Sequence, residues 1–153
     1  MKRILIALLL SIALVHAGSF ERAVEFVLAH EGGYCHDGGY ASNFGISSRW
    51  YPNENMKKMT RERAIEIYRR DYWERTECDM VLDSNFALLI FDTAVLFGQP
   101  TAIIMKKDCW DASAFMEKRV TETAAIIKFD CNKSKYLRTW MLRLLDLQRA
   151  CGL

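Results

Sequence analysis

The stretch HEGGYCHDGGYASNFGIS, residues 30–47, joins the end of a predicted helix to a glycine-rich loop. Ahead of it, apolar residues recur at the spacing of one helix face, which predicts a helix over about 20–30 with Ser19 as its cap. Glu31 follows four residues after Val27 and therefore shares the apolar face of that helix. The sequence thus combines a lone carboxyl group, a helix end and an apolar neighbourhood at one position.

Gly32 and Gly33 are predicted to end this helix, and the chain from 34 to 59 favours a hairpin or an irregular lobe. Tyr40–Ile46 is its most strand-like segment. Helical signals return downstream, where capping residues precede apolar runs with helical spacing. The further predicted helices are 61–73 after Thr60, one from Asp83 or Ser84 to Phe97 before Gly98, one opened by Pro100, and two at about 112–129 and 135–150.

The predicted helix that ends at Phe97 is apolar almost all round, so it should be the buried centre of the fold. The fold class is therefore mainly α, of the α+β kind, with a helical domain and a small irregular or β lobe. We expect a single domain over 18–153, with a catalytic part at 18–98 and a helical C-terminal part at 99–153. A cleft between the helices and the lobe would have Glu31 at its wall.

The N-terminus has the features of a secretory signal. Lys2 and Arg3 precede an apolar run from Ile4 to Val15, and small residues follow it. The run is shorter than the roughly 20 residues that span a bilayer. We therefore expect cleavage after residue 17 and a secreted or periplasmic protein; the alternative is a retained anchor, which would be the protein's sole link to a membrane.

Charge and cysteine content narrow the function classes. The chain has 21 basic and 19 acidic residues, and removal of 1–17 would take away two basic residues and no acidic one. The balance that results excludes nucleic-acid binding by bulk charge. An exported chain can form disulfides, but an odd number of cysteines leaves at least one thiol unpaired and the sequence leaves the pairing open. The five cysteines are Cys35, Cys78, Cys109, Cys131 and Cys151.

Glu31 is the candidate general acid. A carboxyl group near apolar side chains can have its proton affinity raised, as a group that protonates a glycosidic oxygen requires. The aromatic and amide side chains of the following loop suit sugars, because rings stack on pyranose faces and amides bond to hydroxyl groups. The competing interpretation is that Glu31 is an ordinary solvated residue at a helix end.

A glycosidase usually needs a second polar group, and Asp37 is the sole acid in the loop after Glu31. It is either the partner carboxylate or a residue that starts a turn before two glycines. Ser42 could position the attacking water instead. Asn43 could bond to an N-acetyl group or merely hold the turn.

Among the aromatic residues, Tyr34, Phe44 and Trp73 could line sugar subsites, although Trp73 is equally well explained as a core residue. Asp92 lies inside the apolar helix, where a hydrogen-bonded structural role is favoured over catalysis. His30, Cys35 and His36 lie near Glu31 and Asp37 in the sequence, but their spacing matches no metal-binding motif, so no metal site is predicted. The candidate site therefore consists of Glu31 and Asp37 as catalytic residues and of Tyr34, Ser42, Asn43 and Trp73 as substrate-binding residues.

The order of the motifs resembles glycoside hydrolase family 108, the lysozyme-like N-acetylmuramidases of bacterial and phage genomes. The resemblance rests on segments spread over about 20–150. These are Glu31-Gly32-Gly33-Tyr34, Asp37-Gly38-Gly39, Ser42-Asn43-Phe44-Gly45-Ile46, Thr60–Ala64, Tyr68–Trp73, Phe91–Val95 with Gly98, Phe115 to Arg119, and Tyr136 to Arg143.

This resemblance implies a lysozyme-like fold, catalysis by Glu31 without a cofactor, and peptidoglycan glycan strands as the partner. The chain departs from the family pattern in several places. The turn at Asp37 is shorter and lacks a proline, Ser42 stands where threonine is usual, Leu96 and Leu142 stand where asparagine is usual, and residues 99–112 match poorly. Two alternatives therefore stay open. One is a lytic transglycosylase, and the other is a non-catalytic peptidoglycan-binding protein on the same fold.

Overall fold

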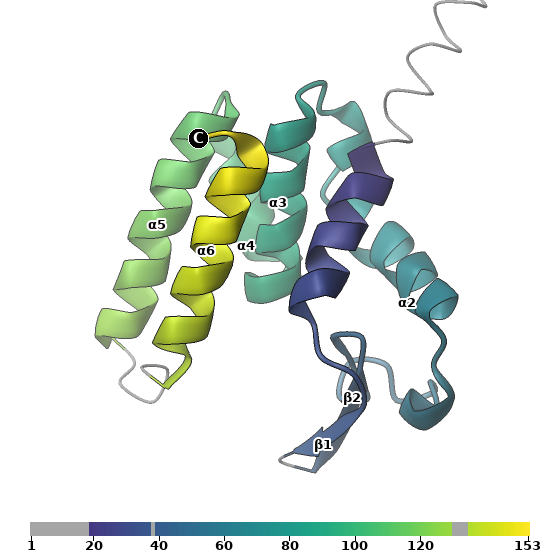
Figure 1. Cartoon of the computed structure of the whole chain (residues 1–153). Helices are drawn as coiled ribbons and strands as arrows, with labels where there is room; N and C mark the ends of the chain where they lie inside the picture. The colour runs from purple at the N-terminus through teal and green to yellow at the C-terminus, as the bar shows by residue number, and fades with distance from the viewer. Residues whose placement is uncertain (1–18, 38, 130–134) are drawn as a thin grey trace, which may run out of the picture. The chain divides into compact units, whose positions relative to one another are not determined.

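The computed structural model describes residues 19–37, 39–129 and 135–153, without the side chains of Asp37 and Ile127. The predicted signal at 1–17 and Cys131 lie outside these residues. The chain packs as two compact units, one ending at Arg75 and the other beginning at Thr76. Helices dominate both, with one small antiparallel sheet (Figure 1), which confirms the mainly α class.

The first unit begins with a helix over residues 19–30. Ser19 is itself helical and is therefore not the residue before the first turn. The apolar stripe packs inward as predicted, and its buried members are Phe20, Ala23, Val24 and Val27. The helix ends where Gly32 and Gly33 follow, but neither glycine has the positive φ of a left-handed helix cap.

The lobe after this helix is a three-stranded sheet of β1 (Cys35–Asp37), β2 (Tyr40–Asn43) and β3 (Ile46–Ser47). The predicted strand Tyr40–Ile46 is wrong as one element, because a two-residue turn at 44–45 reverses the chain and pairs Asn43 with Ile46. Phe44 and Gly45 both have positive φ, 50° and 77°, as a type I′ hairpin turn requires.

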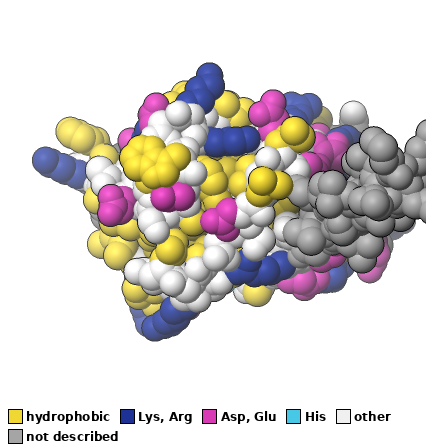
Figure 2. All heavy atoms as spheres, turned by 90° about the horizontal axis from the view of Figure 1, so that it is seen from above, with side chains coloured by type: hydrophobic (Ala, Val, Ile, Leu, Met, Phe, Trp, Pro, Cys, Tyr) yellow, Lys and Arg dark blue, Asp and Glu magenta, His cyan; other side chains and the backbone are white. Residues whose placement is uncertain are grey.

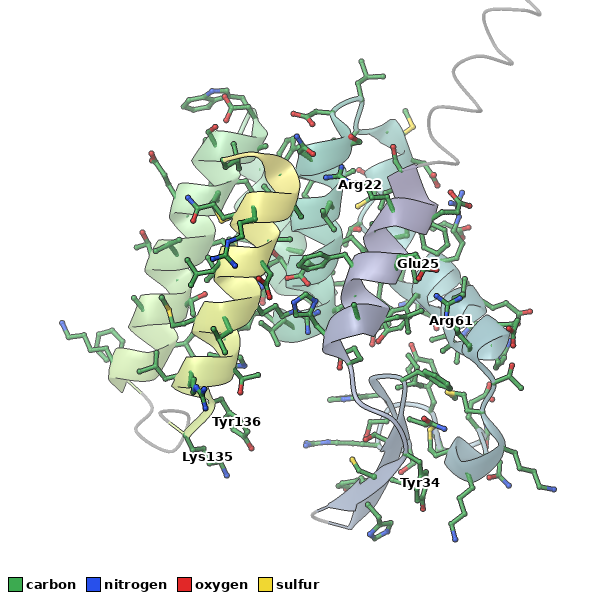
Figure 3. The ribbon with its side chains drawn as sticks, viewed as in Figure 1. Arg22, Glu25, Tyr34, Arg61, Lys135 and Tyr136 are labelled. Atoms are coloured by element: carbon green, nitrogen blue, oxygen red, sulfur yellow. The ribbon has the colours of Figure 1, made fainter. Side chains whose placement is uncertain are left out.

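The second half of this unit begins with a short 3₁₀ helix, η1 (Met56–Lys58). The helix α2 (Arg61–Tyr68) follows, and Thr60 caps it by accepting a hydrogen bond from the Arg63 backbone. The predicted helix 61–73 changes pitch after Tyr68, since Arg69–Trp73 form a π-helical turn, η2. In Figure 3, Arg61 of α2 lies beside Glu25 of the first helix, and the two side chains form an ion pair.

The second unit opens with the 3₁₀ helix η3 (Cys78–Met80) and is built around α3 (Ser84–Phe97), which Asp83 caps and Gly98 ends. Most of α3 is buried, as predicted, and it contacts α4 (Gln99–Lys107), α5 (Ala112–Phe129) and α6 (Leu137–Cys151) (Figure 1). Asp92 of α3 is fully buried and accepts hydrogen bonds from Arg119 and Arg143, at 2.9 and 2.8 Å. This is the structural role that the sequence favours for Asp92.

Charges of both signs are interspersed with hydrophobic side chains on the face seen in Figure 2, in keeping with the balanced composition. Within the described residues, no helix combines the length and the apolarity that crossing a membrane requires. Cys35, Cys78 and Cys109 carry free thiols, of which Cys35 is exposed and Cys78 buried. Burial raises the pKa of the Cys78 thiol to about 12.

Candidate active site

Glu31 lies directly after the first helix, and its backbone N–H donates to the Val27 carbonyl at 3.1 Å. Its side chain is half-buried and faces the β2–β3 turn. A Cβ atom placed on Gly45 would lie 2.8 Å from both Cγ and Oε2 of Glu31. The carboxyl group therefore lies against the bare backbone of the turn, at a distance that no other residue type would permit.

Tyr68 completes this contact from α2. Its fully buried side chain donates a hydrogen bond from the hydroxyl to the Phe44 carbonyl at 2.9 Å, and the same hydroxyl adjoins the Cβ position of Gly45. In the sequence, Tyr68 and Gly45 were singled out only as members of the motifs that resemble the family, without a role in the site. The isolated Gly45 between strand-like residues is the one sequence signal for an irregularity or a close backbone approach at this place.

The π-helical turn η2 adds Tyr72 and Asp71 to this region. Burial raises the pKa of Tyr72, and the negative charges of Asp71 and Glu31 raise it further, so its phenol stays neutral beside Glu31. The hydroxyl of Tyr51 donates to Asp71 at 3.0 Å. Hydrogen bonds from Arg70, then the one from Tyr51, hold the pKa of Asp71 below its usual range. Single-turn π-helices are frequent at functional sites.

The predicted substrate-binding residues have different environments. Tyr34 is 43% exposed, and the hydroxyl of Ser42 lies 3.0 Å from the thiol of Cys35. The Asn43 amide is buried and donates to the Met56 carbonyl at 2.9 Å, so it holds the hairpin. Trp73 does not line a sugar subsite as predicted, and the core interpretation holds instead. Its side chain is fully buried with the ring against Phe20, centroids 5.4 Å apart, and offers no free face to a sugar.

The backbone of Asp37 lies in β1, where it pairs with Tyr40 of β2. Its side chain is outside the described part of the structure, so the role of Asp37 as a second carboxylate stays a prediction. The side chain of Phe44 is half-buried, and its backbone contributes to the site through the carbonyl that Tyr68 binds.

An open pocket of about 390 Å³ lies in the lobe around Tyr34. Lys57 lies over the Tyr34 ring, with its Nζ 5.9 Å from the ring centroid. The carboxylate of Glu54 is bound by Arg63 at 2.6 Å and is thereby neutralised. The pocket thus offers an aromatic ring, amide groups and a positive charge. Its lining residues are Tyr34, Ala41, Ser48, Asn53, Glu54, Asn55, Met56 and Lys57.

Possible metal ligands do not gather in the described part of the chain, where no three His, Cys, Asp or Glu side chains are arranged to hold an ion. His30 bonds instead through Nδ1 to the Phe26 carbonyl of its own helix, at 2.9 Å.

Residues 24–98 match the family model described as Glycosyl hydrolase 108. This range includes Glu31, the whole sheet, α2, η2 and α3. No curated protein and no solved structure shows significant similarity to the chain.

Proposed function

Since the chain belongs to glycosyl hydrolase family 108 through residues 24–98, and is accordingly a glycosidase, we propose that it is an exported peptidoglycan hydrolase. The bond cleaved would be the β-1,4 link between N-acetylmuramic acid and N-acetylglucosamine. Glu31 acts as the general acid. Export follows from the basic and apolar N-terminal sequence, which has the pattern of a secretory signal.

The position of Glu31 is the observation that carries this proposal. The residue lies in the matched segment, at a helix end and half-buried, with its carboxyl group against the Gly45 backbone. A solvated surface glutamate needs no such fit. The exposed ring of Tyr34 and the pocket beside it supply the kind of surface that N-acetylated sugars bind.

The proposed hydrolysis uses one proton from Glu31 and consumes one water molecule. Protonated Glu31 gives its proton to the glycosidic oxygen as the bond to the anomeric carbon breaks. Water then adds to that carbon, directly or after an internal nucleophile has trapped it, and its proton returns to a carboxylate. Asp37 or Ser42 would orient this water. The ammonium group of Lys57, which is the positive charge of the pocket, would face the carboxylate of the lactyl group or of the attached peptide.

Replacement of Glu31 by Gln tests the assignment, because it keeps the shape of the side chain and removes the acidic proton. We expect E31Q to lose lysis of purified peptidoglycan by at least about 10²-fold, the lower end of the usual effect of a general acid. Glu21→Gln is the matched control, since Glu21 is exposed on the helix that ends just before Glu31. Lysis by E31Q at the rate of the unmodified protein would refute the role of Glu31.

Mass spectrometry of the digested muropeptides distinguishes the alternatives. A reducing N-acetylmuramic acid end supports hydrolysis, whereas a 1,6-anhydro product would identify a lytic transglycosylase. Leu96 and Leu142, which replace the asparagines usual in the family, motivate the non-catalytic alternative. Sedimentation with peptidoglycan without any released muropeptide would support that alternative and contradict the proposed hydrolysis.

A further inference from the structure

We propose that the Phe44–Gly45 turn, held in place by Tyr68, fixes the position of the Glu31 carboxyl group and is thus a positioning element for catalysis. The inference rests on the proposed function, because it assigns a task to groups that do not themselves react. Three features of the first unit support it: the lack of space for a side chain at Gly45, the hydrogen bond from Tyr68 to the turn, and the anchoring of the hairpin by Asn43.

Gly45 is required at its position for two independent reasons. Its φ of +77° is rare for residues with a side chain. A Cβ atom would also lie 2.8 Å from Cγ and Oε2 of Glu31 and still closer to the Tyr68 hydroxyl. A hairpin turn explains the first requirement. The second concerns Glu31 itself, because the turn occupies the space into which its carboxyl group would otherwise swing.

Tyr68 determines how closely the turn approaches Glu31. Its hydroxyl bonds to the Phe44 carbonyl from a fully buried ring on α2, 24 residues along the chain. The ring of Tyr72 lies next to it, with centroids 5.4 Å apart. Because a close-packed aromatic ring resists displacement, its hydroxyl is a fixed point to which the turn is attached.

The two strand residues that flank the turn are anchored as well. The amide of Asn43 donates to the Met56 carbonyl at 2.9 Å, and the side chain of Ile46 is almost completely buried. These residues flank the turn on both sides and form its last strand pair. The turn is therefore held at three points, and Glu31 lies against its closed end.

A general acid must lie within hydrogen-bond reach of the oxygen that it protonates. Displacement of a catalytic group by about 1 Å can lower the rate by about 10²-fold. An added methyl group at residue 45 must displace either the turn or Glu31, since both contacts are too short to accommodate it. The turnover number should then fall much more than substrate affinity, because the sugar-binding surface is unchanged.

Gly45→Ala tests the inference, with Gly152→Ala as the control for backbone strain. Gly152 also has a positive φ, +67°, but a Cβ atom there meets nothing within 4 Å. For G45A we expect kcat on soluble peptidoglycan fragments to fall by about 10²-fold with KM changed less than about threefold. For G152A we expect kcat and KM close to those of the unmodified protein. An equal loss of kcat in both variants overturns the inference.

Tyr68→Phe is the second variant, because it keeps the ring and removes only the hydroxyl. We expect Y68F to lower kcat by about tenfold with KM unchanged, through release of the Phe44 carbonyl. In the G45A protein the same change should cost much less, since the turn is already displaced. Independent, multiplicative losses in the double variant would contradict a shared positioning role.

A readout without activity separates this inference from the proposed function. The side-chain carboxyl ¹³C resonance of Glu31, assigned by its loss in E31Q, reports the environment of the group directly. We expect it to shift in G45A and Y68F and to stay in place in G152A. If the unmodified protein cleaves no peptidoglycan, the proposed function fails, whereas an unmoved resonance in G45A refutes the positioning role itself.

Discussion

The buried charge cluster of the second unit gives a prediction whose size follows from its geometry. Asp92 on α3 is 0% exposed, and its two oxygens accept from Arg119 at 2.9 Å and Arg143 at 2.8 Å. The two guanidinium groups are themselves only 1% and 6% exposed. The Asp92 carboxylate therefore binds two buried cations, which come from α5 and α6.

Asp92→Asn removes the negative charge and places the amide NH₂ group, a hydrogen-bond donor, against one of the two arginines. Loss of one partner of a buried ion pair costs about 3–5 kcal/mol, because the other charge stays buried without compensation. For a unit of this size, about 4–8 °C is lost per kcal/mol, so the melting temperature of this unit should fall by roughly 12–40 °C. Arg119 already lies over the Phe97 ring at 4.8 Å, a contact that offsets little of this loss.

Urea unfolding followed by circular dichroism measures this free energy. Asp108→Asn is the matched control, because Asp108 forms an ion pair with Lys118 but is 63% exposed, and such pairs contribute at most about 1 kcal/mol. Joint replacement of Asp92, Arg119 and Arg143 by Leu, Met and Met should recover most of the loss. A cost for D92N no greater than that for D108N would refute the reasoning.

Two further predictions concern the first unit. Asp71→Asn should lower the free energy of unfolding at pH 7 by about 1–3 kcal/mol, because Asp71 accepts charged hydrogen bonds from Arg70. The pKa of Asp71 is lowered in the folded protein, so its contribution is present above the unfolded pKa of about 3.9 and is lost as pH falls through the folded value. Urea unfolding measured between pH 7 and pH 2 should show that the unfolding free energies of the unmodified protein and of D71N converge as pH falls. A difference that stays constant over this range would contradict the prediction. Lys57→Ala should raise KM for muropeptides by about three- to tenfold, worth about 1 kcal/mol, and leave kcat unchanged; equal KM values for both proteins would remove Lys57 from the binding surface.

The helices were largely predictable because their signals are local. Residues 112–129 were predicted within the bounds that the structure has, and Asp83 and Gly98 mark the ends of α3 as expected. The predicted helix 61–73 lost its regular pitch at Arg69, since the choice between α and π hydrogen bonding depends on tertiary packing. The choice for Trp73 between a sugar subsite and the core was left open in the sequence for the same reason, and in the structure the π turn buries its side chain against Phe20.

The geometry of the candidate site could be predicted from the sequence only in part, because it is tertiary. Glu31 could be singled out from its apolar stripe and the two glycines after it. The contact among Glu31, Gly45 and Tyr68 joins three segments that no local pattern relates.

A glycine in a hairpin turn has a sufficient explanation in its φ angle, so the sequence gives no reason to seek a second one. The second reason lies in the 2.8 Å between its Cβ position and the Glu31 carboxyl group. A turn that only reversed the chain could lie anywhere on the lobe surface. Gly39 is an example, because it also has a positive φ but has open space around its Cβ position. At Gly45 the turn is instead bonded to a buried tyrosine and pressed against a half-buried carboxyl group. This close fit is what a general acid of fixed orientation requires, and it is the physical ground on which catalysis is favoured over passive binding.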